Sequence, residues 1–482
     1  MNTQKIKDKI NRRSFLHSAA GVGAGLVFSP IASSQEKSSN KPDDINVALL
    51  GAGEQGWCLM NVCLKIPGIR FKAVCDIWTA YNQKRASRLL KKYRYDHNTY
   101  TDYRDMLDKE KDLDAVIVAT PDFWHSPHTV ACLEAGLHVY CETAMSNTVE
   151  DAAKMVKAVR RTGKLLQIGC QRRSNPRYLY CYDKLMKGRK VLGRVAAVSG
   201  QWNRVVGVPM GWPRFASLDR PTLERYGYES MAQFRNWRWY KGLGGGPVVS
   251  LGSHQIDVIN WFLGTNPISV MASGRTSYLD KKMHQWYDTM MAVYEYETDQ
   301  GPICVYYQIL SHNRSDGCFE RFFGEQGTLE LSETANRAIV FPELMNSDNK
   351  VWARSVKEGC LVGHDEMMKM IDKLTVEQVA RIFFVEESLP LPPIDNIHDM
   401  AKGIIRHANR RVLTVPVEMN KPFHQPHLEN FFDAIRGKAR LNCPAEVGYE
   451  TAVAVLKVNE AAEAGRKLDF KPAEFNPWQN PA

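Results

Sequence analysis

Short apolar runs alternate with amphipathic stretches from residue 45 to about residue 168. Nearly continuous apolar runs are typical of strands buried on both faces, and the stretches between them have the periodicity of helices. The alternation therefore predicts an α/β domain built on a doubly wound parallel sheet. Its predicted strands are residues 45–50, 70–75, 114–119, 137–141 and 165–168.

After Gln171, aromatic and β-branched residues alternate with polar ones. This pattern predicts an α+β domain over residues 171–470 with an open antiparallel sheet, one face of which lies on a core. The predicted strands are residues 195–202, 268–274, 289–296, 303–309 and 328–331.

Residues 332–420 fit this sheet poorly, so we interpret them as an insertion that carries a helix-like stretch near residues 364–384. Helical periodicity returns at residues 427–435 and 446–465. Residues 471–482 are assigned to a C-terminal tail.

Three spaced glycines follow the first predicted strand, in the sequence I-N-V-A-L-L-G-A-G-E-Q-G. Gly51 permits a tight turn, Gly53 lets the backbone approach a pyrophosphate, and Gly56 lets the next helix pack against the strand. The free amides that open this helix suit an anion. Glu54 and Gln55 lie in the same turn and are expected to contact the same ligand.

The second apolar run ends in Asp76. An acid at this distance from the glycine turn can accept both ribose hydroxyls of an adenosine, and its charge repels a 2′-phosphate. We therefore predict a Rossmann domain over residues 45–170 that binds NAD rather than NADP.

Polar residues follow two later strands of the same sheet. Thr120, Trp124 and His125 follow the run at residues 114–119, and Glu142 follows the run at residues 137–141. Ligands bind beyond the carboxyl ends of parallel strands, so these residues are expected to face the nicotinamide half of the cofactor.

A second group of candidates surrounds the glycine-rich turn at residues 244–246. His254 follows this turn on a predicted helix, and its ordinary pKa of about 6.5 suits a base near neutral pH. The alternative is a hydrogen-bonded core histidine. Four aromatic side chains near this turn suit contact with a ligand, although core packing explains them equally well: Trp202, Trp237, Trp239 and Tyr240.

The N-terminus predicts export. Arg12 and Arg13 precede a mildly apolar run that is too short for a membrane span of about 20 residues, and a small-x-small cleavage site follows near residue 34. Residues 1–34 are therefore predicted to be a twin-arginine signal peptide for the periplasm, with residues 35–44 as a linker. A disordered basic tail is the alternative.

Composition limits the possible partners. The formal net charge is +10, but residues 1–34 account for +4 of it and the other cations are scattered, which is unlike a nucleic-acid patch. Eleven cysteines without a C-x-x-C pair indicate folding in a reducing compartment, which suits a route that exports folded proteins. We expect no metal site, because Pro426 separates His424 from His427 and a histidine at a helix start is the favoured interpretation.

The motifs together resemble the Gfo/Idh/MocA family of oxidoreductases over residues 43–331 and 421–470. The matches, in chain order, are the glycine turn, Asp76, Ala119-Thr120-Pro121 with Trp124-His125, Tyr140-Cys141-Glu142, Gln171-Arg172-Arg173, and Gly244 to His254. The resemblance implies an NAD-dependent enzyme acting on a sugar, with Gln171 and Arg172 near the cofactor. It also implies that the open sheet pairs with a second copy of the chain.

Two positions depart from the family pattern. The family dehydrogenases usually carry a lysine after the glutamate of the fifth-strand turn, where this chain has Thr143. They often carry an aspartate four residues before the histidine, where this chain has Ser250. Arg172, Tyr240 or His125 is expected to replace the lysine by hydrogen-bonding the substrate oxygen, with Arg172, Trp239, Tyr240 and His254 as substrate residues.

Three functions remain open on the sequence alone. The leading hypothesis is oxidation of a sugar or glycoside hydroxyl by NAD, with His254 as the base. The second is a redox-neutral glycosidase that keeps its NAD through oxidation, elimination, addition of water and re-reduction. The third is a binding protein that holds NAD without catalysis.

Overall fold

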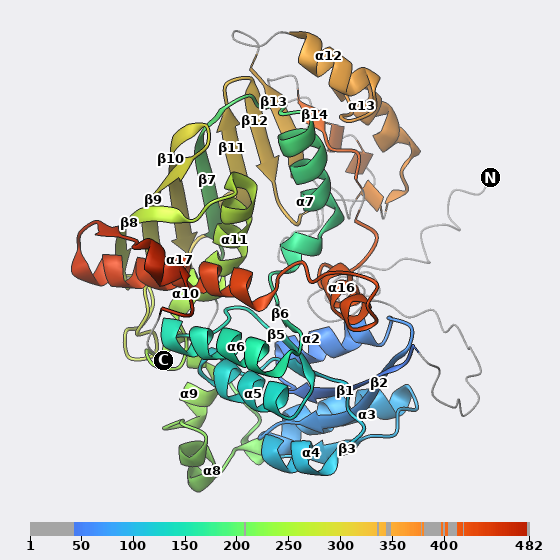
Figure 1. Cartoon of the computed structure of the whole chain (residues 1–482), viewed down its shortest axis with the longest axis vertical. Helices are drawn as coiled ribbons and strands as arrows, with labels where there is room; N and C mark the ends of the chain where they lie inside the picture. The colour runs from blue at the N-terminus through green and yellow to red at the C-terminus, as the bar shows by residue number, and fades with distance from the viewer. Residues whose placement is uncertain are drawn as a thin grey trace, which may run out of the picture. The chain divides into compact units, whose positions relative to one another are not determined.

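The computed structural model describes residues 43–206, 209–334, 337–343, 349–376, 378–379, 397–398, 401–402, 412–417 and 419–479 (Figure 1). The predicted signal peptide and most of the predicted linker lie outside these residues. The chain divides into two compact units, residues 43–368 with 408–482, and residues 1–42 with 369–407. Every site residue discussed below belongs to the first unit.

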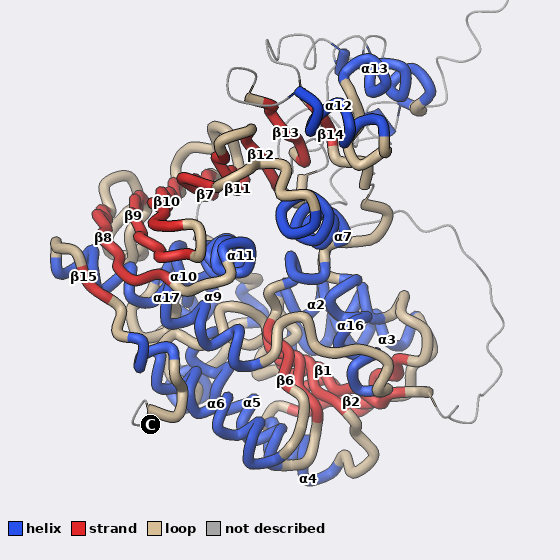
Figure 2. The backbone as a smooth tube through the Cα atoms, turned by 45° about the horizontal axis from the view of Figure 1, so that its top comes forward, coloured by secondary structure: helices blue, strands red, loops and turns tan. Residues whose placement is uncertain are grey.

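The N-terminal part of this unit is a six-stranded parallel sheet in the order β3-β2-β1-β4-β5-β6. Its strands are β1 (Ile45–Leu50), β2 (Ile69–Cys75), β3 (Asn98–Tyr100), β4 (Ala115–Val118), β5 (His138–Cys141) and β6 (Leu166–Ile168). The helices that cover it are α2 (Glu54–Cys63), α3 (Lys84–Lys92), α4 (Tyr103–Lys109), α5 (Asp122–Glu134) and α6 (Val149–Thr162) (Figures 1 and 2). The order is that of a Rossmann fold, so the predicted α/β class is confirmed.

The strands form where the sequence is apolar on both faces. All six residues of β1 and all four of β4 are buried. All five predicted strands are present, whereas β3 is a short, polar strand at the sheet edge that the apolar pattern does not reveal.

The second sheet has nine strands in the order β14-β13-β12-β11-β7-β10-β9-β8-β15. They are β7 (Val195–Asn203), β8 (Pro267–Arg275), β9 (Thr289–Thr298), β10 (Gly301–Leu310), β11 (Cys318–Gly324), β12 (Gly327–Leu331), β13 (Ala338–Pro342), β14 (Leu413–Thr414) and β15 (Leu468–Asp469). β7 and β10 run parallel, so the sheet is mixed rather than purely antiparallel as predicted. β13 and β14 extend this sheet from within the predicted insertion, which corrects the expectation that residues 332–420 lie outside it.

Helices cover one face of the mixed sheet (Figure 2). α11 (Gly252–Leu263) and α17 (Ala445–Ala464) pack on that face. The other helices after β6 are α7 (Pro176–Tyr180), α8 (Arg220–Arg225), α9 (Met231–Arg235), α10 (Gly246–Ser250), α12 (Asn349–Lys357), α13 (His364–Lys373) and α16 (Gln425–Ile435). One core cluster includes residues of both sheets together with α17, which ties the two halves of the unit together.

Helix α16 returns from the C-terminal part to the parallel sheet. Its Leu428, Phe431 and Phe432 are fully buried in the same cluster as Val47 of β1 and Ile117 of β4. The segment just before α16 therefore lies near the glycine turn. Among the described residues, no helix combines the length and apolar character that crossing a membrane requires.

Candidate active site

The glycine turn between β1 and α2 has the close contacts that the motif predicts. Gly51 has a φ of +90°, and a Cβ there would lie 2.7 Å from the carbonyl of Ala119. At Gly56 a Cβ would lie 1.9 Å from the carbonyl oxygen of Gly51. At Gly53 the nearest atom would be the Asn82 amide nitrogen at 3.9 Å, so the space beside this residue is open. The turn fits a dinucleotide whose pyrophosphate passes Gly53.

Asp76 lies beside this turn at the end of β2. Its carboxylate accepts hydrogen bonds from the backbone amides of Ala52 and Trp78, both at 2.7 Å, and from Asn82 at 3.3 Å. Burial raises the pKa of Asp76, while these hydrogen bonds oppose the shift. The Asn82 amide oxygen is buried and has no hydrogen-bond partner among the described residues. The pair offers the polar atoms that an adenosine ribose needs.

His125 lies on α5 and is buried between two backbone carbonyls. Its Nδ1 is 2.8 Å from the oxygen of Ala144, and its Nε2 is 2.7 Å from the oxygen of Thr120. Burial lowers the pKa of His125, but Cys141, Asp122 and the Ala144 carbonyl outweigh burial and raise the pKa to about 10. A ring that donates to two carbonyls has no lone pair for a substrate proton, so this arrangement suits support of the strand-end turns rather than the predicted base.

The other predicted residues at and just before the start of α5 are also engaged with protein. The Thr120 hydroxyl lies 3.0 Å from Nδ1 of His128. The Trp124 indole donates to the carbonyl of Tyr226 at 3.2 Å and stacks on His128. These contacts bring the segment that carries α8 and α9 to the carboxyl edge of the parallel sheet.

Glu142, at the end of β5, joins three parts of the chain. It accepts a hydrogen bond from the Gln55 amide at 3.1 Å and one from its neighbour, the Thr143 backbone amide, at 3.2 Å. The same Gln55 nitrogen lies 3.0 Å from Nε2 of His424, just before α16. Glu54, by contrast, is exposed and pairs with Arg85.

Arg172 lies at the centre of a buried ion-pair network. Its guanidinium donates to Glu320 on β11, to Glu333 after β12 at 3.2 Å, and to the Cys318 sulfur at 3.2 Å. Gln171 donates to Glu333 at 3.3 Å. Arg172 therefore connects the parallel sheet to the mixed sheet, and its donors face protein groups rather than an open cleft.

His254 lies on α11 above this network. Its Nδ1 is buried and has no hydrogen-bond partner among the described residues. Burial, followed by the positive charge of Arg172 and the neighbouring rings of His424 and His427, lowers the pKa of His254 well below 6.5, so its ring is neutral at physiological pH. Its ring centre lies 5.9 Å from that of Trp202. The neutral ring is in the protonation state that a base needs, and the lowered pKa makes it a weaker proton acceptor than an ordinary histidine.

The remaining predicted substrate residues pack against other side chains. Trp239 meets His284 edge to face at 4.5 Å, and the Tyr240 hydroxyl lies 3.6 Å from the Met283 sulfur. Both are 8% exposed, and Trp237 belongs to an aromatic cluster around Trp78. Their packing explains their presence without a ligand, and their predicted contact with a sugar stays a prediction.

Three charged or titratable residues of the site were not among the predicted ones: Glu320, Glu333 and His424. Glu320 interrupts the apolar pattern of β11 in C-F-E-R-F-F-G, and a lone acid in such a run signals a buried cation as partner. Glu333 follows a strand end. His424 carries no local signal, because its partner Gln55 lies 369 positions away in the sequence.

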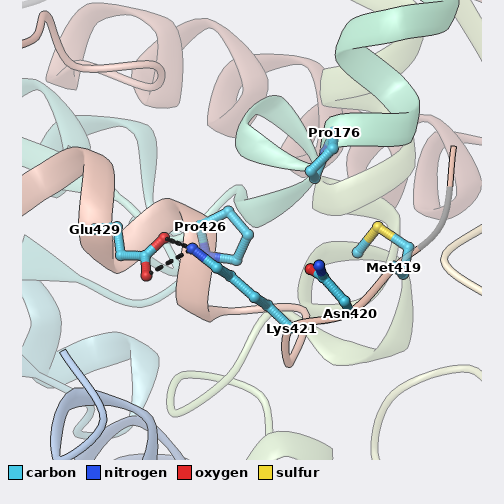
Figure 3. A pocket seen from close by; sticks show the side chains of 6 residues that line it. All are labelled: Pro176, Met419, Asn420, Lys421, Pro426 and Glu429. Carbon is cyan, nitrogen blue, oxygen red and sulfur yellow. Dashed lines mark hydrogen bonds and ion pairs between the residues drawn. The ribbon is translucent and has the colours of Figure 1, made fainter.

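Two other features of the described residues lie apart from these groups. Cys170, Asp257 and Cys443 are clustered closely enough for a metal, but Arg173 binds both Asp257 oxygens at 2.9 and 2.8 Å and already neutralises the site. A pocket of about 220 Å³ is lined by Pro176, Met419, Asn420, Lys421, Pro426 and Glu429 (Figure 3). None of the predicted site residues lines this pocket.

Comparison with known protein families shows which family this chain belongs to. The profile described as "Oxidoreductase family, NAD-binding Rossmann fold" matches residues 45–170, and that of its "C-terminal alpha/beta domain" matches residues 220–470. The chain belongs to the Gfo/Idh/MocA oxidoreductase family. It is thus a member of a family of NAD-dependent enzymes, and the predicted cofactor is NAD.

Among curated proteins, this Gfo/Idh/MocA chain is 33% identical over 175 residues to a glycosyl hydrolase family 109 protein of Shewanella baltica. It is 30% identical over 175 residues to an α-N-acetylgalactosaminidase of Shewanella oneidensis. Each match covers 32% of this chain and spans 38% of the relative's length.

Solved structures share the fold at lower identity. The aldose-aldose oxidoreductase of Caulobacter crescentus superposes with a TM-score of 0.61 at 17% identity, covering 89% of this chain and 100% of that one. A levoglucosan dehydrogenase in complex with NADH and levoglucosan gives 0.60 at 16% identity, covering 89% and 99%.

Proposed function

We propose that this chain oxidises a hydroxyl group of a sugar or glycoside to a carbonyl, using NAD. The observation that carries the proposal is the neutral His254, whose buried Nδ1 has no hydrogen-bond partner among the described residues. The names of structurally similar proteins, an aldose-aldose oxidoreductase and a levoglucosan dehydrogenase, support a sugar as substrate.

The chain's own groups divide the work. The glycine turn would hold the pyrophosphate, and Asp76 with Asn82 would hold the adenosine ribose. When bound, NAD supplies an acceptor for the hydride of the carbon that is oxidised. His254 takes the hydroxyl proton, so the substrate loses one proton to the ring and two electrons with the hydride.

The redox-neutral glycosidase remains as a second candidate, because the curated relatives are named glycosyl hydrolase family 109 proteins and an α-N-acetylgalactosaminidase. Its net reaction is glycoside plus water to a free sugar and the alcohol of the leaving group, and the NAD returns to its starting state. An exported enzyme would need no soluble redox partner for such a cycle.

One experiment separates these functions. The purified protein, with any NAD that co-purifies, is incubated with a panel of sugars and glycosides while nicotinamide absorbance and released sugar are both followed. Accumulating reduced cofactor supports the oxidoreductase. Released sugar without net reduction supports the glycosidase.

The matched pair of variants is His254→Gln and His97→Gln. His97 contacts Ser87 and the Tyr95 carbonyl, away from the groups described above. We expect His254→Gln to abolish turnover and His97→Gln to keep it. Bound NAD with no reaction on any compound of the panel would support the non-catalytic binding protein instead.

Export and assembly are part of the proposal. We propose that the twin-arginine signal sends the folded protein to the periplasm, and replacing Arg12 and Arg13 by lysine should retain it in the cytoplasm. We also propose that the open face of the mixed sheet pairs with a second copy, because it exposes Ile268, Met271, Met291 and Tyr306. Met271→Lys should then shift the mass measured by light scattering toward the monomer.

A further inference from the structure

The segment just before the glycine-rich turn at residues 244–246 buries its aromatic side chains and exposes the arginine between them. Trp237 and Trp239 are each 8% exposed. Arg238 lies between them in the short helical turn Trp237–Trp239, and it is exposed. The side chain that this segment presents to solvent is therefore an arginine.

The backbone of Arg238 is held at the carboxyl edge of the parallel sheet. A Cβ at Gly244 would lie 2.9 Å from the Cα of Arg238, so the glycine-rich turn packs directly on this residue. The carbonyl of Gly242 accepts a hydrogen bond at 2.9 Å from Asn147, which lies in the turn after β5. Trp237 belongs to the same aromatic cluster as the first residues of α5. Arg238 is thus fixed beside the ends of β4 and β5, where parallel sheets bind their ligands.

The guanidinium of Arg238 forms no hydrogen bond or ion pair with any described residue. One side of it rests on the ring of Trp237, whose centre lies 4.3 Å from the guanidinium carbon. Its positive charge interacts with the carboxylates of Asp122, at the start of α5, and Glu142, after β5. Oδ2 of Asp122 has no hydrogen-bond partner in the described part of the chain. The two acids offset the charge of Arg238 and leave its N–H groups free for a ligand.

Protein surrounds Arg238 even though its side chain is exposed. Desolvation by this protein lowers the pKa of the guanidinium, and the charges of Asp122 and Glu142 oppose the shift. An arginine stays protonated in proteins, so the group remains a cation. Hydrogen bonds formed in such surroundings are stronger than hydrogen bonds in water. Arg238 is therefore placed to bind a ligand with its free N–H groups.

The two arginines that follow β6 differ from Arg238, because protein groups occupy their donors. Arg172 is paired with Glu320 and Glu333. Arg173 donates to both carboxylate oxygens of Asp257. These two arginines therefore hold the fold together, whereas Arg238 offers its donors to solvent.

We propose that Arg238 is a substrate-binding residue that selects sugars with two neighbouring hydroxyl groups, because its planar fork donates to both oxygens. The proposal rests on the function proposed above, which makes a sugar or glycoside the substrate. The guanidinium fork matches two adjacent oxygen atoms, and the vicinal hydroxyls of a sugar ring provide such a pair. Arg238 thereby orients the ring for removal of the hydride. The role is the same in the oxidoreductase and in the glycosidase, since both begin by oxidising a hydroxyl.

The carboxylate of a uronic acid also has two adjacent oxygens. Asp122 and Glu142 already offset the positive charge of Arg238, which favours neutral hydroxyl groups over a further anion. The tests below distinguish the two kinds of ligand.

The kinetic test compares Arg238→Met, Arg238→Lys and Arg220→Met in the full NAD-loaded protein, with the best sugar of the panel above. We expect Arg238→Met to lower kcat/KM by about 10²-fold, chiefly through KM, because two charged hydrogen bonds to the substrate are lost. Arg238→Lys should recover at most about tenfold of this loss, since a lysine keeps the charge but not the fork. Arg220 is 85% exposed on α8 and pairs with Glu224. Arg220→Met should stay within about twofold of wild type, as expected for an exposed ion pair.

Deoxy analogues of the same sugar test the two hydrogen bonds. In wild type, at least one analogue that lacks a hydroxyl next to the reacting one should lower kcat/KM by about tenfold or more. In Arg238→Met the same analogue should cost less than about threefold, because the donor to that oxygen is already absent. A structural effect of Arg238 would not depend on which oxygen the substrate carries. Equal losses in the two proteins would therefore overturn the proposal, as would a wild-type kcat/KM in Arg238→Met.

Chemical labelling gives a readout that does not depend on turnover. Phenylglyoxal modifies accessible arginines that have no partner, and peptide mass spectrometry follows each site. In the NAD-loaded protein, Arg238 should react faster than Arg172 and Arg173. A panel sugar at ten times its dissociation constant should slow the labelling of Arg238 by about tenfold, and that of Arg220 not at all.

The labelling can contradict the proposal in three ways. Arg238 may react no faster than Arg172, its labelling may be the same with every sugar of the panel, or uronic acids may protect it better than neutral sugars. Each of these results would overturn the proposal. Protection by a neutral sugar without any turnover would instead support the role of Arg238 and count against the proposed function.

Discussion

His125 and His254 have opposite surroundings, although sequence reasoning assigned both to catalysis. His125 donates from both ring nitrogens to carbonyl oxygens, which favours the protonated ring. Nδ1 of His254 has no hydrogen-bond partner in the described part of the chain, and burial together with the positive charge of Arg172 favours the neutral ring. The comparison teaches that partners, rather than the residue type or its place at a strand end, decide whether a histidine can exchange a proton.

The largest expected effect separates the two histidines by activity. His254→Gln should lower kcat/KM by about 10³-fold, because general-base catalysis contributes roughly 10²- to 10⁴-fold. The free energy of unfolding should change by less than about 1 kcal/mol, since Nδ1 forfeits no hydrogen bond. Steady-state kinetics and urea unfolding measure the two quantities. A stability loss that accounts for the lost activity would assign His254 to structure.

The next effect concerns the cation beside His254. Arg172→Met should lower the free energy of unfolding by about 3–5 kcal/mol, because it leaves Glu320 and Glu333 without their buried partner. In folded protein the pKa of His254 should rise, since a nearby positive charge is removed. Urea unfolding and histidine NMR test this. An unchanged free energy of unfolding would mean that Arg172 does not neutralise Glu320 and Glu333 as described.

His125 should affect stability more than chemistry. His125→Gln removes one or both hydrogen bonds from a charged ring and should cost about 1.5–3 kcal/mol of unfolding free energy. Folded His125→Gln at saturating NAD should keep kcat within a few-fold of wild type. If the kcat of folded His125→Gln instead fell by about 10²-fold or more, His125 would take part in catalysis.

The last prediction is a contrast in pH dependence. The pKa of His125 is raised to about 10 in the folded state against about 6.5 unfolded, so its stabilisation is complete below pH 6.5 and is lost as the pH rises toward 10. The pKa of His254 is lowered on folding, so the unfolded state binds a proton more readily than the folded state. The free energy of unfolding therefore falls as the pH drops below 6.5. Unfolding free energies from pH 5 to 10 should lose the alkaline slope in His125→Gln and part of the acid slope in His254→Gln. Equal slopes in both variants and wild type would contradict both assignments.

Much of the fold was accessible from the sequence because burial is periodic. The five strands predicted in the parallel sheet agree with the structure to within one residue at each end. β11 was not predicted, since Glu320 and Arg321 break its apolar pattern while their partners Arg172 and Glu330 lie elsewhere in the chain. β13 and β14 were assigned to an insertion because short strands at a sheet edge carry little periodic signal.

The candidate site likewise has residues that the sequence could predict and contacts that it could not. The glycine turn and Asp76 were predictable, because backbone geometry near a pyrophosphate restricts the residue type locally. Glu142 and His254 were found by position, but their partners Gln55, Arg172 and His424 come together only through long-range packing of α16 and the mixed sheet. Local sequence therefore identified the cofactor and left the long-range contacts of these residues undetermined.

The most direct test of the central claim is a single-turnover measurement of cofactor reduction. NAD-loaded wild type and His254→Gln are mixed with the same saturating sugar or glycoside, and the nicotinamide absorbance is followed from the first milliseconds. The proposed role predicts rapid reduction in wild type and a rate lower by about 10³-fold in His254→Gln at equal NAD occupancy. Equal rates in the two proteins would contradict His254 as the base of this enzyme.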